Sequence, residues 1–571
     1  MITHYPIWSQ ECAKKYLSRT LNTFLIHGNV HDLVSIGSEE SAPQFLRLHE
    51  FLADEFFGAR DIVLFYNRAS GVYFRDKASR EDFEQALQAR DSVLGTAYAT
   101  SLPKDPVRIF SILESYFRLR LGQNKSVALI TEHAETIVPM NDAGSTGVED
   151  RNALVYITRW AQDPVLLGGD FTHIILTENL NDLNRTLIQH PYTSEISIPH
   201  PDASARRRYL ESEIPEDEYA KVFELPIHVL AQQTAGLTIL QLQSLYFNAK
   251  ENKEPLNLDT ITQTKKELIE AEAYGLLEFV ESAFSLKDVA GHRLVKEHLQ
   301  LTAKALKEGN PEVLPMGYFV CGPVGTGKTF LVQCFAKDVG IPMVKLKNFR
   351  SQWQGVTEGN LEKILHLLEA MAPVAVMIDE ADAYLGDRSA SGDSGVSSRV
   401  FSQIASFMSN TEHRGRIIWF LMTARPDLMP IDLKRQGRAE EHLALFPPQN
   451  SEEKEELFRA MAKKTKIKLE VEVVPELLLS DSYHLSGADM EAVLTRAKFE
   501  AVAHGKESVD LAMLEQVIQN FIPPTYPEEV ELQTLLAVLE CTSKKLLPDV
   551  YTQMDRQELL SRIEELRFRI A

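Results

Sequence analysis

The sequence predicts an α/β protein in two halves, each built on a parallel sheet, with a helical tail after the second half. Helix and strand patterns alternate through the first half, which is typical of a parallel sheet covered by helices. A glycine-rich loop, Gly322–Thr329, joins an apolar strand to a helix in the second half. A further apolar strand there, at 374–378, ends in the acid pair Asp379-Glu380. These three observations carry the prediction.

Length and composition describe a globular protein of several domains. The 571 residues exceed what one hydrophobic core organises, and about three or four domains are expected. The formal charge of −21 disfavours a general nucleic-acid or anionic-membrane binder, because such surfaces need clustered Lys and Arg. The four cysteines show no metal-ligand spacing, so we expect reduced thiols.

No segment predicts export or a membrane span. The first residues lack the basic and then apolar order of a signal peptide. The longest apolar runs, such as 370–378, have the length of a buried strand. We therefore expect a cytoplasmic protein that makes no membrane contact.

The elements of the first half follow one another as short apolar runs and helical periods. The predicted strands cover 24–26, 61–66, 126–130 and 173–177, and the predicted helices cover 42–57 and 109–121. His27 and His31 follow the first strand. No third ligand is spaced near them, so we interpret both as turn and surface residues rather than metal ligands.

The first half repeats the order of the second but lacks its chemistry. Its strand at 127–130 ends in Thr131-Glu132, at the place of Asp379-Glu380 in the second half. No GxxxxGK[ST] pattern occurs before Gly322. We interpret the first half as a degenerate copy kept for structure or partner binding. An unrelated α/β domain is the alternative.

The loop of the second half is a P-loop in its strand–loop–helix context. Converging backbone N–H groups and the helix N-terminus favour phosphate there. Lys328 is expected to reach the β- and γ-phosphates of ATP, and the Thr329 hydroxyl to bind Mg²⁺. The predicted phosphate-binding residues are Gly322, Pro323, Val324, Gly325, Thr326, Gly327, Lys328 and Thr329.

Two carboxylates and two arginines complete the predicted chemistry. Asp379 is expected to hold Mg²⁺ directly or through water, and Glu380 to orient or activate the attacking water. Arg435 and Arg438 lie in a short basic segment and are candidates to stabilise transition-state charge in a neighbouring site. A solvated basic turn is the alternative for the arginines. Ser486 is expected to cap a helix, with Asp489 completing a capping box.

With these motifs the second half resembles the classical AAA clade of AAA+ ATPases, over about 284–520. The resemblance places Val289 of Asp288-Val289-Ala290-Gly291 on the adenine side, with Gly487 and Ala488 of the lid motif at the adenine and ribose. It implies that Arg435 and Arg438 are the two arginine fingers. It also implies that Trp353, Gln354 and Gly355 form a pore loop. A buried core position is the alternative for Trp353, which its polar neighbours disfavour.

Two positions depart from the pattern of that clade. Ala424 stands where the sensor-1 asparagine is expected, so the usual donor to the γ-phosphate or attacking water is missing unless Thr423 or Arg425 substitutes. Gln354 is polar where the pore loop has an apolar residue.

The whole chain resembles tandem AAA proteins of bacteria and plastids, in which a nucleotide-silent first module precedes an active one. The expected domains are a degenerate AAA+-like α/β domain at 1–200, its helical lid at 201–262, a linker at 263–283, an active α/β subdomain at 284–445, a helical lid at 446–520 and a C-terminal helical extension at 521–571.

The function implied is that of a Mg²⁺-dependent ATPase that remodels a protein partner as a ring, in the family a hexamer. A slow ATP-switched assembly or regulatory scaffold is the alternative. A nucleic-acid motor or loader is a third reading, which the acidic charge and the lack of a basic, aromatic-interleaved groove disfavour.

Overall fold

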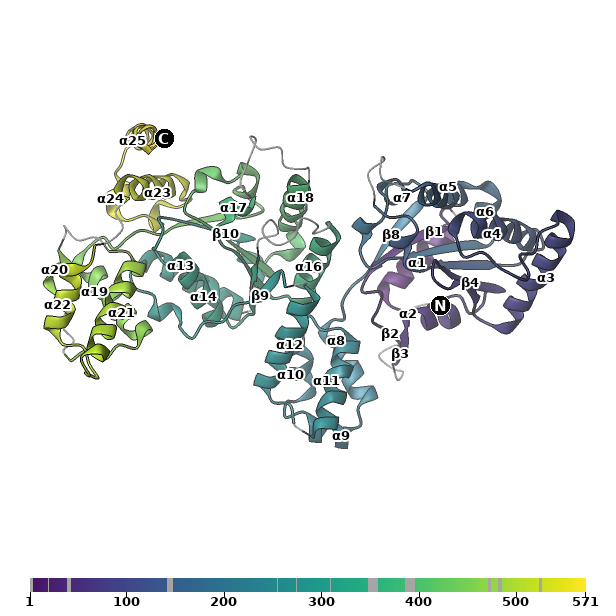
Figure 1. Ribbon diagram of the computed structural model, residues 1–571, viewed down its shortest axis with the longest axis horizontal. Coiled ribbons are helices and arrows are strands. Elements are labelled where there is room, and N and C mark those ends of the chain that lie inside the picture. The colour runs from purple at the N-terminus through teal and green to yellow at the C-terminus, as the bar shows by residue number, and fades with distance from the viewer. Residues whose placement is uncertain are drawn as a thin grey trace. The chain divides into compact units, whose positions relative to one another are not determined.

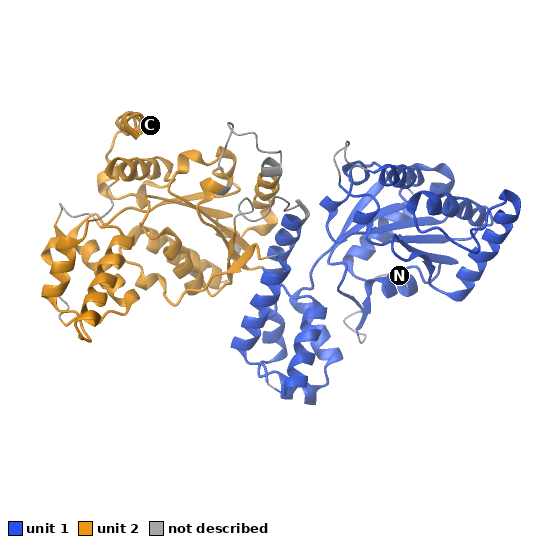
Figure 2. Ribbon diagram, in the orientation of Figure 1, with its two compact units in different colours: residues 1–274, 355–371 blue, residues 275–354, 372–571 orange. Residues whose placement is uncertain are grey.

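The chain folds into two compact units, which Figure 2 shows in two colours. Unit 1 comprises residues 1–274 and 355–371, and unit 2 comprises residues 275–354 and 372–571. The computed structural model describes residues 4–18, 20–37, 43–140, 147–253, 255–273, 275–308, 310–347, 358–385, 396–470, 474–480, 485–522 and 526–570.

Unit 1 is built on a six-stranded sheet in the order β5-β4-β6-β7-β1-β8. All neighbouring pairs are parallel except β5, which runs antiparallel to β4. Buried side chains line both faces of β6 and β7, as expected of a parallel sheet between helical layers. The strands are β1 (Thr23–Gly28), β4 (Ile62–Asn67), β5 (Gly71–Phe74), β6 (Val127–Thr131), β7 (Phe171–Leu176) and β8 (Thr193–Ile198).

Helices cover this sheet on both faces, and each face has its own core (Figure 1). One core joins the sheet to the helices after β5, around Phe117 and Trp160. The other joins it to α1 and η1, around Trp8 and Phe51. The helices involved are α3 (Lys77–Leu94), α4 (Pro106–Leu121) and α5 (Val148–Gln162) on the first face, and α1 (Ile7–Leu17) and the π-helix η1 (Phe51–Phe56) on the second.

The predicted helix over 42–57 is wrong in its first part. Residues Gln44–Arg47 form strand β3, which pairs antiparallel with β2 (Leu33–Ile36), and helical structure begins only at α2 (Leu48–Glu50). The hydrophobic periodicity of a four-residue segment does not distinguish a short strand of a two-stranded ribbon from a turn of helix.

Five helices after β8 form a subdomain with its own core around Leu242 and Ile261. Helix α11 begins at a capping box in which Thr238 and Gln241 bond each other's backbone N–H groups. The helices are α8 (Ala203–Glu213), α9 (Glu216–Val222), α10 (Ile227–Gln233), α11 (Ile239–Asn252) and α12 (Leu258–Glu272). Helix α12 therefore runs through the first part of the predicted linker.

Unit 1 also contains a helix from the second half of the sequence. This is α16 (Glu358–Met371), which follows the segment containing Trp353 and precedes the strand that ends at Asp379. It packs against the short helix η3 (Leu180–Asp182), which follows β7.

Unit 2 is built on a second six-stranded sheet, in the order β14-β10-β13-β12-β11-β9. Its strands are β9 (Leu277–Phe279), β10 (Gly317–Cys321), β11 (Met343–Leu346), β12 (Val374–Ile378), β13 (Ile417–Thr423) and β14 (Glu441–Ala444). Only β9 is antiparallel, to β11. Strand β9 lies in the second part of the predicted linker.

The two sheets share one topology. When the parallel strands of each sheet are numbered along the chain, both sheets have the order 5-1-4-3-2. Both also carry an antiparallel strand beside the second strand, β5 in unit 1 and β9 in unit 2. The prediction of two α/β modules with parallel sheets is confirmed.

Several helices accompany the second sheet, among them α17 (Ala381–Leu385) and α18 (Val396–Met408) (Figure 1). Helices α13 (Arg293–Lys307) and α14 (Lys328–Val339) share a core with it. A helical subdomain has its own core around Phe458 and Leu494. Its helices are α19 (Ser451–Thr465), α20 (Glu476–Leu479), α21 (Gly487–Ala503) and α22 (Leu511–Asn520), and the last three of the chain are α23 (Pro527–Glu540), α24 (Asp549–Thr552) and α25 (Arg556–Ile570).

Helix α25 packs against α23, as its apolar stripe predicts. Leu559, Ile563 and Leu566 are buried there. In the parts of the chain that the structure describes, no helix combines the length and the apolar content needed to cross a bilayer.

Candidate nucleotide-binding site

The glycine-rich loop leaves the buried strand β10 and enters α14 through backbone conformations that favour glycine. Gly322 has a φ of 148°, and a Cβ there would lie 2.2 Å from the carbonyl oxygen of Leu445. Gly325 has a φ of 83°, and a Cβ there would lie 2.7 Å from Cβ of Ser486. Gly327, with a φ of 82°, caps α14. The loop backbone is therefore closely packed against β14 on one side and the lid on the other.

Lys328 begins α14 and its side chain folds over the loop. Its Nζ donates to the carbonyl oxygens of Gly322, at 2.8 Å, and Pro323, at 2.9 Å. Burial lowers the pKa of Lys328 to about 8, although the charges of Asp379 and Asp382 act in the opposite direction. A phosphate at this loop would add a further negative charge beside the Lys328 ammonium group.

The P-loop hydroxyl and the carboxylate at the end of β12 meet. Thr329 Oγ1 donates to Asp379 Oδ2 at 3.1 Å, and Lys345 Nζ lies 3.7 Å from the same oxygen. The contact follows from topology, because β13 alone separates β10 from β12 and all three strands end at one edge. A hydroxyl beside a carboxylate is the oxygen donor set that Mg²⁺ prefers, so the residues fit that ion.

Glu380 lies directly after Asp379 in a left-handed conformation, with a φ of 50°. Its backbone N–H donates to Asp379 Oδ1 at 3.1 Å. Left-handed backbone in a residue other than glycine is uncommon and is concentrated at functional sites.

The end of β13 lacks the expected amide donor. Thr423 Oγ1 donates to Asp382 Oδ1 at 2.6 Å, and the Arg425 guanidinium binds both carboxylate oxygens of Asp427 at 3.0 Å. Both residues that could replace an asparagine at Ala424 therefore already have partners inside the chain.

The predicted adenine-side segment lies between α13 and the lid. Val289 is buried, and its carbonyl oxygen accepts from Lys296 Nζ at 2.7 Å. Gly291 N donates to Glu456 Oε2 of α19 at 3.0 Å. His292 Nε2 lies 2.9 Å from the carbonyl oxygen of Thr326, and burial lowers the pKa of His292 to about 4.

The lid helix α21 begins against the P-loop. Ser486 and Asp489 form the predicted capping box, which is confirmed. Gly487 N donates to the carbonyl oxygen of Gly325 at 3.2 Å, while Ala488 is exposed. Lid and phosphate loop are thus joined at the backbone level.

The two candidate arginine fingers differ in exposure. The Arg435 side chain is 59% exposed and lies 3.6 Å from Asp432. The Arg438 side chain is only 10% exposed, and it donates to the carbonyl oxygen of Asp432 at 2.7 Å. Of the two, Arg435 is the one that a neighbouring chain could reach without local rearrangement.

Sequence reasoning missed two residues of α23 that touch this site. Gln533 Oε1 accepts from Val324 N of the P-loop at 3.1 Å, and Glu540 Oε1 lies 2.5 Å from Lys434 Nζ, one residue before Arg435. Buried His442 also contacts the carbonyl oxygen of Glu540, at 2.8 Å. No motif signals these contacts, because they join segments about 100 to 200 residues apart.

The predicted pore-loop residues Trp353, Gln354 and Gly355 lie outside the described residues. Their assignment stays a prediction.

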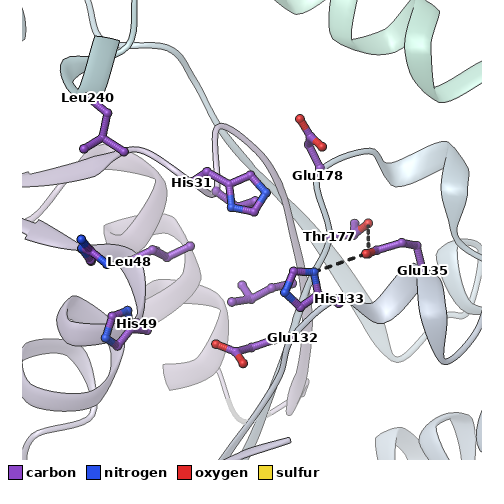
Figure 3. A pocket seen from close by; sticks show the side chains of 12 residues that line it. His31, Leu48, His49, Glu132, His133, Glu135, Thr177, Glu178 and Leu240 are labelled. Carbon is purple, nitrogen blue, oxygen red and sulfur yellow. Dashed lines mark hydrogen bonds and ion pairs between the residues drawn. The ribbon is translucent and has the colours of Figure 1, made fainter. Parts of the chain in front are cut away.

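Unit 1 has a cavity of about 450 Å³ at the carboxyl ends of β1, β6 and β7, shown in Figure 3. Its lining is rich in carboxylates and histidines, and the described residues that line it include no lysine. Asp32 lies nearby and accepts from the backbone N–H groups of Ile239 and Leu240, each at 3.0 Å. The polar lining residues are His31, Arg47, His49, Glu132, His133, Glu135, Thr177 and Glu178.

Three family models match the chain. Residues 2–199 match the N-terminal Rossmann-like domain of AAA+ chaperones, and residues 204–274 match their second helical domain. Residues 318–446 match the AAA family, described as ATPases associated with various cellular activities. The first two models match residues before β9, and the third matches residues after it.

Several curated proteins are similar to this chain. A cell division cycle protein 48 homolog of Archaeoglobus fulgidus is 24% identical over 66% of this chain and 55% of its own length. The AAA domain-containing protein ycf46 of Guillardia theta is 24% identical over 55% of this chain and 63% of its own length. The ATP-dependent zinc metalloprotease FtsH 2 of Salinibacter ruber is 26% identical over 45% of this chain and 38% of its own length. The chain thus spans about half the length of the curated relatives it matches.

Proposed function

We propose that this chain, which joins two AAA+ chaperone domains to an AAA ATPase domain, binds and hydrolyses ATP with Mg²⁺ at one site in unit 2. The observation that carries the proposal is the contact between Thr329 and Asp379 beside the half-buried Lys328. It brings a hydroxyl, a carboxylate and an ammonium group together at the end of one P-loop, as Mg²⁺-dependent phosphoryl transfer requires.

Each residue has a distinct part in the proposed reaction. Lys328 exchanges its two carbonyl partners for the β- and γ-phosphates, and Thr329 and Asp379 hold the ion. Mg²⁺ neutralises charge on the β- and γ-phosphate oxygens when it is bound. Glu380 orients the attacking water and accepts its proton. Val289, Gly487 and Ala488 are assigned to the base and ribose, and the backbone contact between Gly487 and Gly325 supports a coupling of these residues to the phosphates.

The first module is proposed to bind no nucleotide. Asp32 binds the backbone N–H groups at the N-terminus of α11 and places a carboxylate near the cavity at the ends of β1, β6 and β7. The nearby cavity adds carboxylates, which repel phosphates, and its described lining includes Arg47 but no lysine. Both observations support a structural or partner-binding role for unit 1.

We propose further that the chain works as a ring, a hexamer by its resemblance to the family, and remodels a protein partner. The domains matched to AAA+ chaperones support a protein as the partner. The exposure of Arg435 supports completion of the site by a neighbouring chain. All four cysteines are free thiols, which supports action in the reducing cytoplasm.

Arg435→Ala is expected to lower the ATPase rate by about 10–100-fold, because one charge-assisted hydrogen bond to the transition state is worth about 1.5–3 kcal/mol. Mixing this variant with Lys328→Ala chains is expected to restore part of the activity, since each variant supplies what the other lacks. A steady-state assay of the mixture measures the effect, and wild-type activity per chain should rise with concentration. Arg207→Ala, on the exposed surface of unit 1, is the matched control. An ATPase activity per chain that does not depend on concentration, measured on a proven monomer, would contradict the proposed ring.

The second candidate function is a slow ATP-switched assembly or regulatory scaffold. The end of β13 favours it, since Ala424 offers no amide donor and both Thr423 and Arg425 have other partners. A steady-state ATPase assay with and without a protein partner separates the scaffold from the remodelling ATPase. A scaffold changes its assembly when ATP binds, but it hydrolyses ATP slowly in both conditions.

A further inference from the structure

Unit 1 contains a cluster of three metal-ligating side chains that the proposed ATPase site does not use. The cluster consists of His27, at the end of β1, and Glu362 and His366, both on α16. One ligand atom from each side chain lies within 4.8 Å of the others. The spacing of four residues places Glu362 and His366 on one face of the helix.

The distances match those between the ligands of one metal ion. His27 Nδ1 lies 3.5 Å from Glu362 Oε1, and His366 Nε2 lies 3.8 Å from the same oxygen. Two ligands bound tetrahedrally to zinc at about 2.0–2.2 Å are about 3.3–3.6 Å apart. Two imidazoles and one carboxylate leave a fourth position open.

His27 corrects the interpretation made from the sequence. It is 7% exposed and therefore no surface residue. Its Nδ1 is buried without a hydrogen-bond partner, although it is directed at Glu362. A buried polar atom without a partner carries a free-energy cost that a bound ion would remove.

Both helix residues of the cluster are held by further polar groups. Glu362 Oε2 accepts from Asn181 N at 3.1 Å and from Asn181 Nδ2 at 2.8 Å, which directs its other oxygen to the histidines. His366 Nδ1 lies 3.4 Å from Glu369 Oε2. A carboxylate on the second ring nitrogen is the arrangement that orients a histidine whose other nitrogen binds metal.

We propose that His27, Glu362 and His366 bind one divalent transition-metal ion, of which zinc suits the two imidazoles and the carboxylate best. The site ties β1 of the Rossmann-like domain to α16. In the sequence, α16 lies between the predicted pore loop and the strand that ends at Asp379. The metal is thus a structural link within unit 1, independent of the proposed ATPase activity.

An ion-pair network is the competing account of the same cluster. Although burial lowers the pKa of His366, hydrogen bonds to Glu362 and Glu369 raise it to about 9. A protonated His366 between two carboxylates needs no metal. The two accounts differ in what a cysteine does at this position, since a thiolate is a good zinc ligand but cannot replace an imidazolium cation.

The test is the binding of Zn²⁺ and Co²⁺ to the nucleotide-free full chain after removal of metal by chelation. We expect one Zn²⁺ per chain, measured by competition with a chromophoric chelator, and an intense visible absorption with Co²⁺ typical of a tetrahedral site. His27→Asn and His366→Gln should lower the affinity at least about 100-fold, and Glu369→Gln about tenfold. His366→Cys should keep tight binding.

The exposed His133, in the same unit, provides the control variant His133→Gln, which should bind as the wild type does. Circular dichroism checks the fold of each variant. Glu369→Gln keeps all three ligands, so it still tests the proposal if the histidine variants do not fold. Less than about 0.1 Zn²⁺ per chain at saturation, or unchanged affinity in His366→Gln and Glu369→Gln, would overturn the proposal in favour of the ion-pair network.

Discussion

Replacement of Glu380 by Gln is expected to lower kcat for ATP hydrolysis by about 10²–10⁴-fold, the contribution of a positioned general base. The amide keeps the size of the side chain but cannot accept a proton from water. ATP affinity should change less than about threefold, because the phosphate contacts assigned to Lys328 and Thr329 remain. Single-turnover hydrolysis together with a nucleotide-binding titration measures both quantities.

The control for this variant is Glu412→Gln, which changes an exposed glutamate of the short helix η6 (Thr411–His413) in the same unit. It should retain wild-type turnover. A Glu380→Gln chain that hydrolyses ATP at the wild-type rate would assign the proton acceptor to another residue.

Lys328→Ala is expected to raise the Kd for Mg·ATP at least about 100-fold, since each hydrogen bond from a charged group is worth about 1.5–3 kcal/mol. Steady-state hydrolysis should vanish with binding. The fold should survive, because the partners of the side chain among the described residues are the loop carbonyls of Gly322 and Pro323. Calorimetric titration gives the affinity, and a thermal melt checks the fold.

Lys337→Ala is the matched control, because Lys337 lies in the last turn of the same helix, α14, and is exposed. It should bind ATP as the wild type does. Normal ATP affinity in a folded Lys328→Ala chain would remove the basis of the P-loop assignment.

The fold class and the central strands follow from sequence patterns. Buried parallel strands are continuous apolar runs, and β12 and β13 begin and end where the runs at 374–378 and 417–423 do. The antiparallel edge strands β5 and β9 were not predicted, because edge strands are short and only partly buried. Strand β3 was assigned to a helix for the same reason.

In the candidate site, too, the residues of local motifs are predicted from the sequence, and the residues from distant segments are not. The P-loop and Asp379-Glu380 carry their chemistry within a few consecutive residues, so the sequence alone locates them. Gln533 and Glu540 reach the site from a helix about 200 residues after the P-loop, and no local pattern places them there. Glu362 and His366 are four residues apart on one helix, but their neighbour His27 is more than 300 residues away in the sequence, and only the fold brings it close.

The claim that unit 2 holds the one nucleotide site of the chain is tested most directly by equilibrium titration of Mg·ATP into the Glu380→Gln chain, in which bound ATP is not consumed. We predict one ATP per chain at saturation, and none when Lys328→Ala is added to the same chain. Two ATP per chain, or one that persists after Lys328→Ala, would contradict the account by placing a nucleotide in the first module.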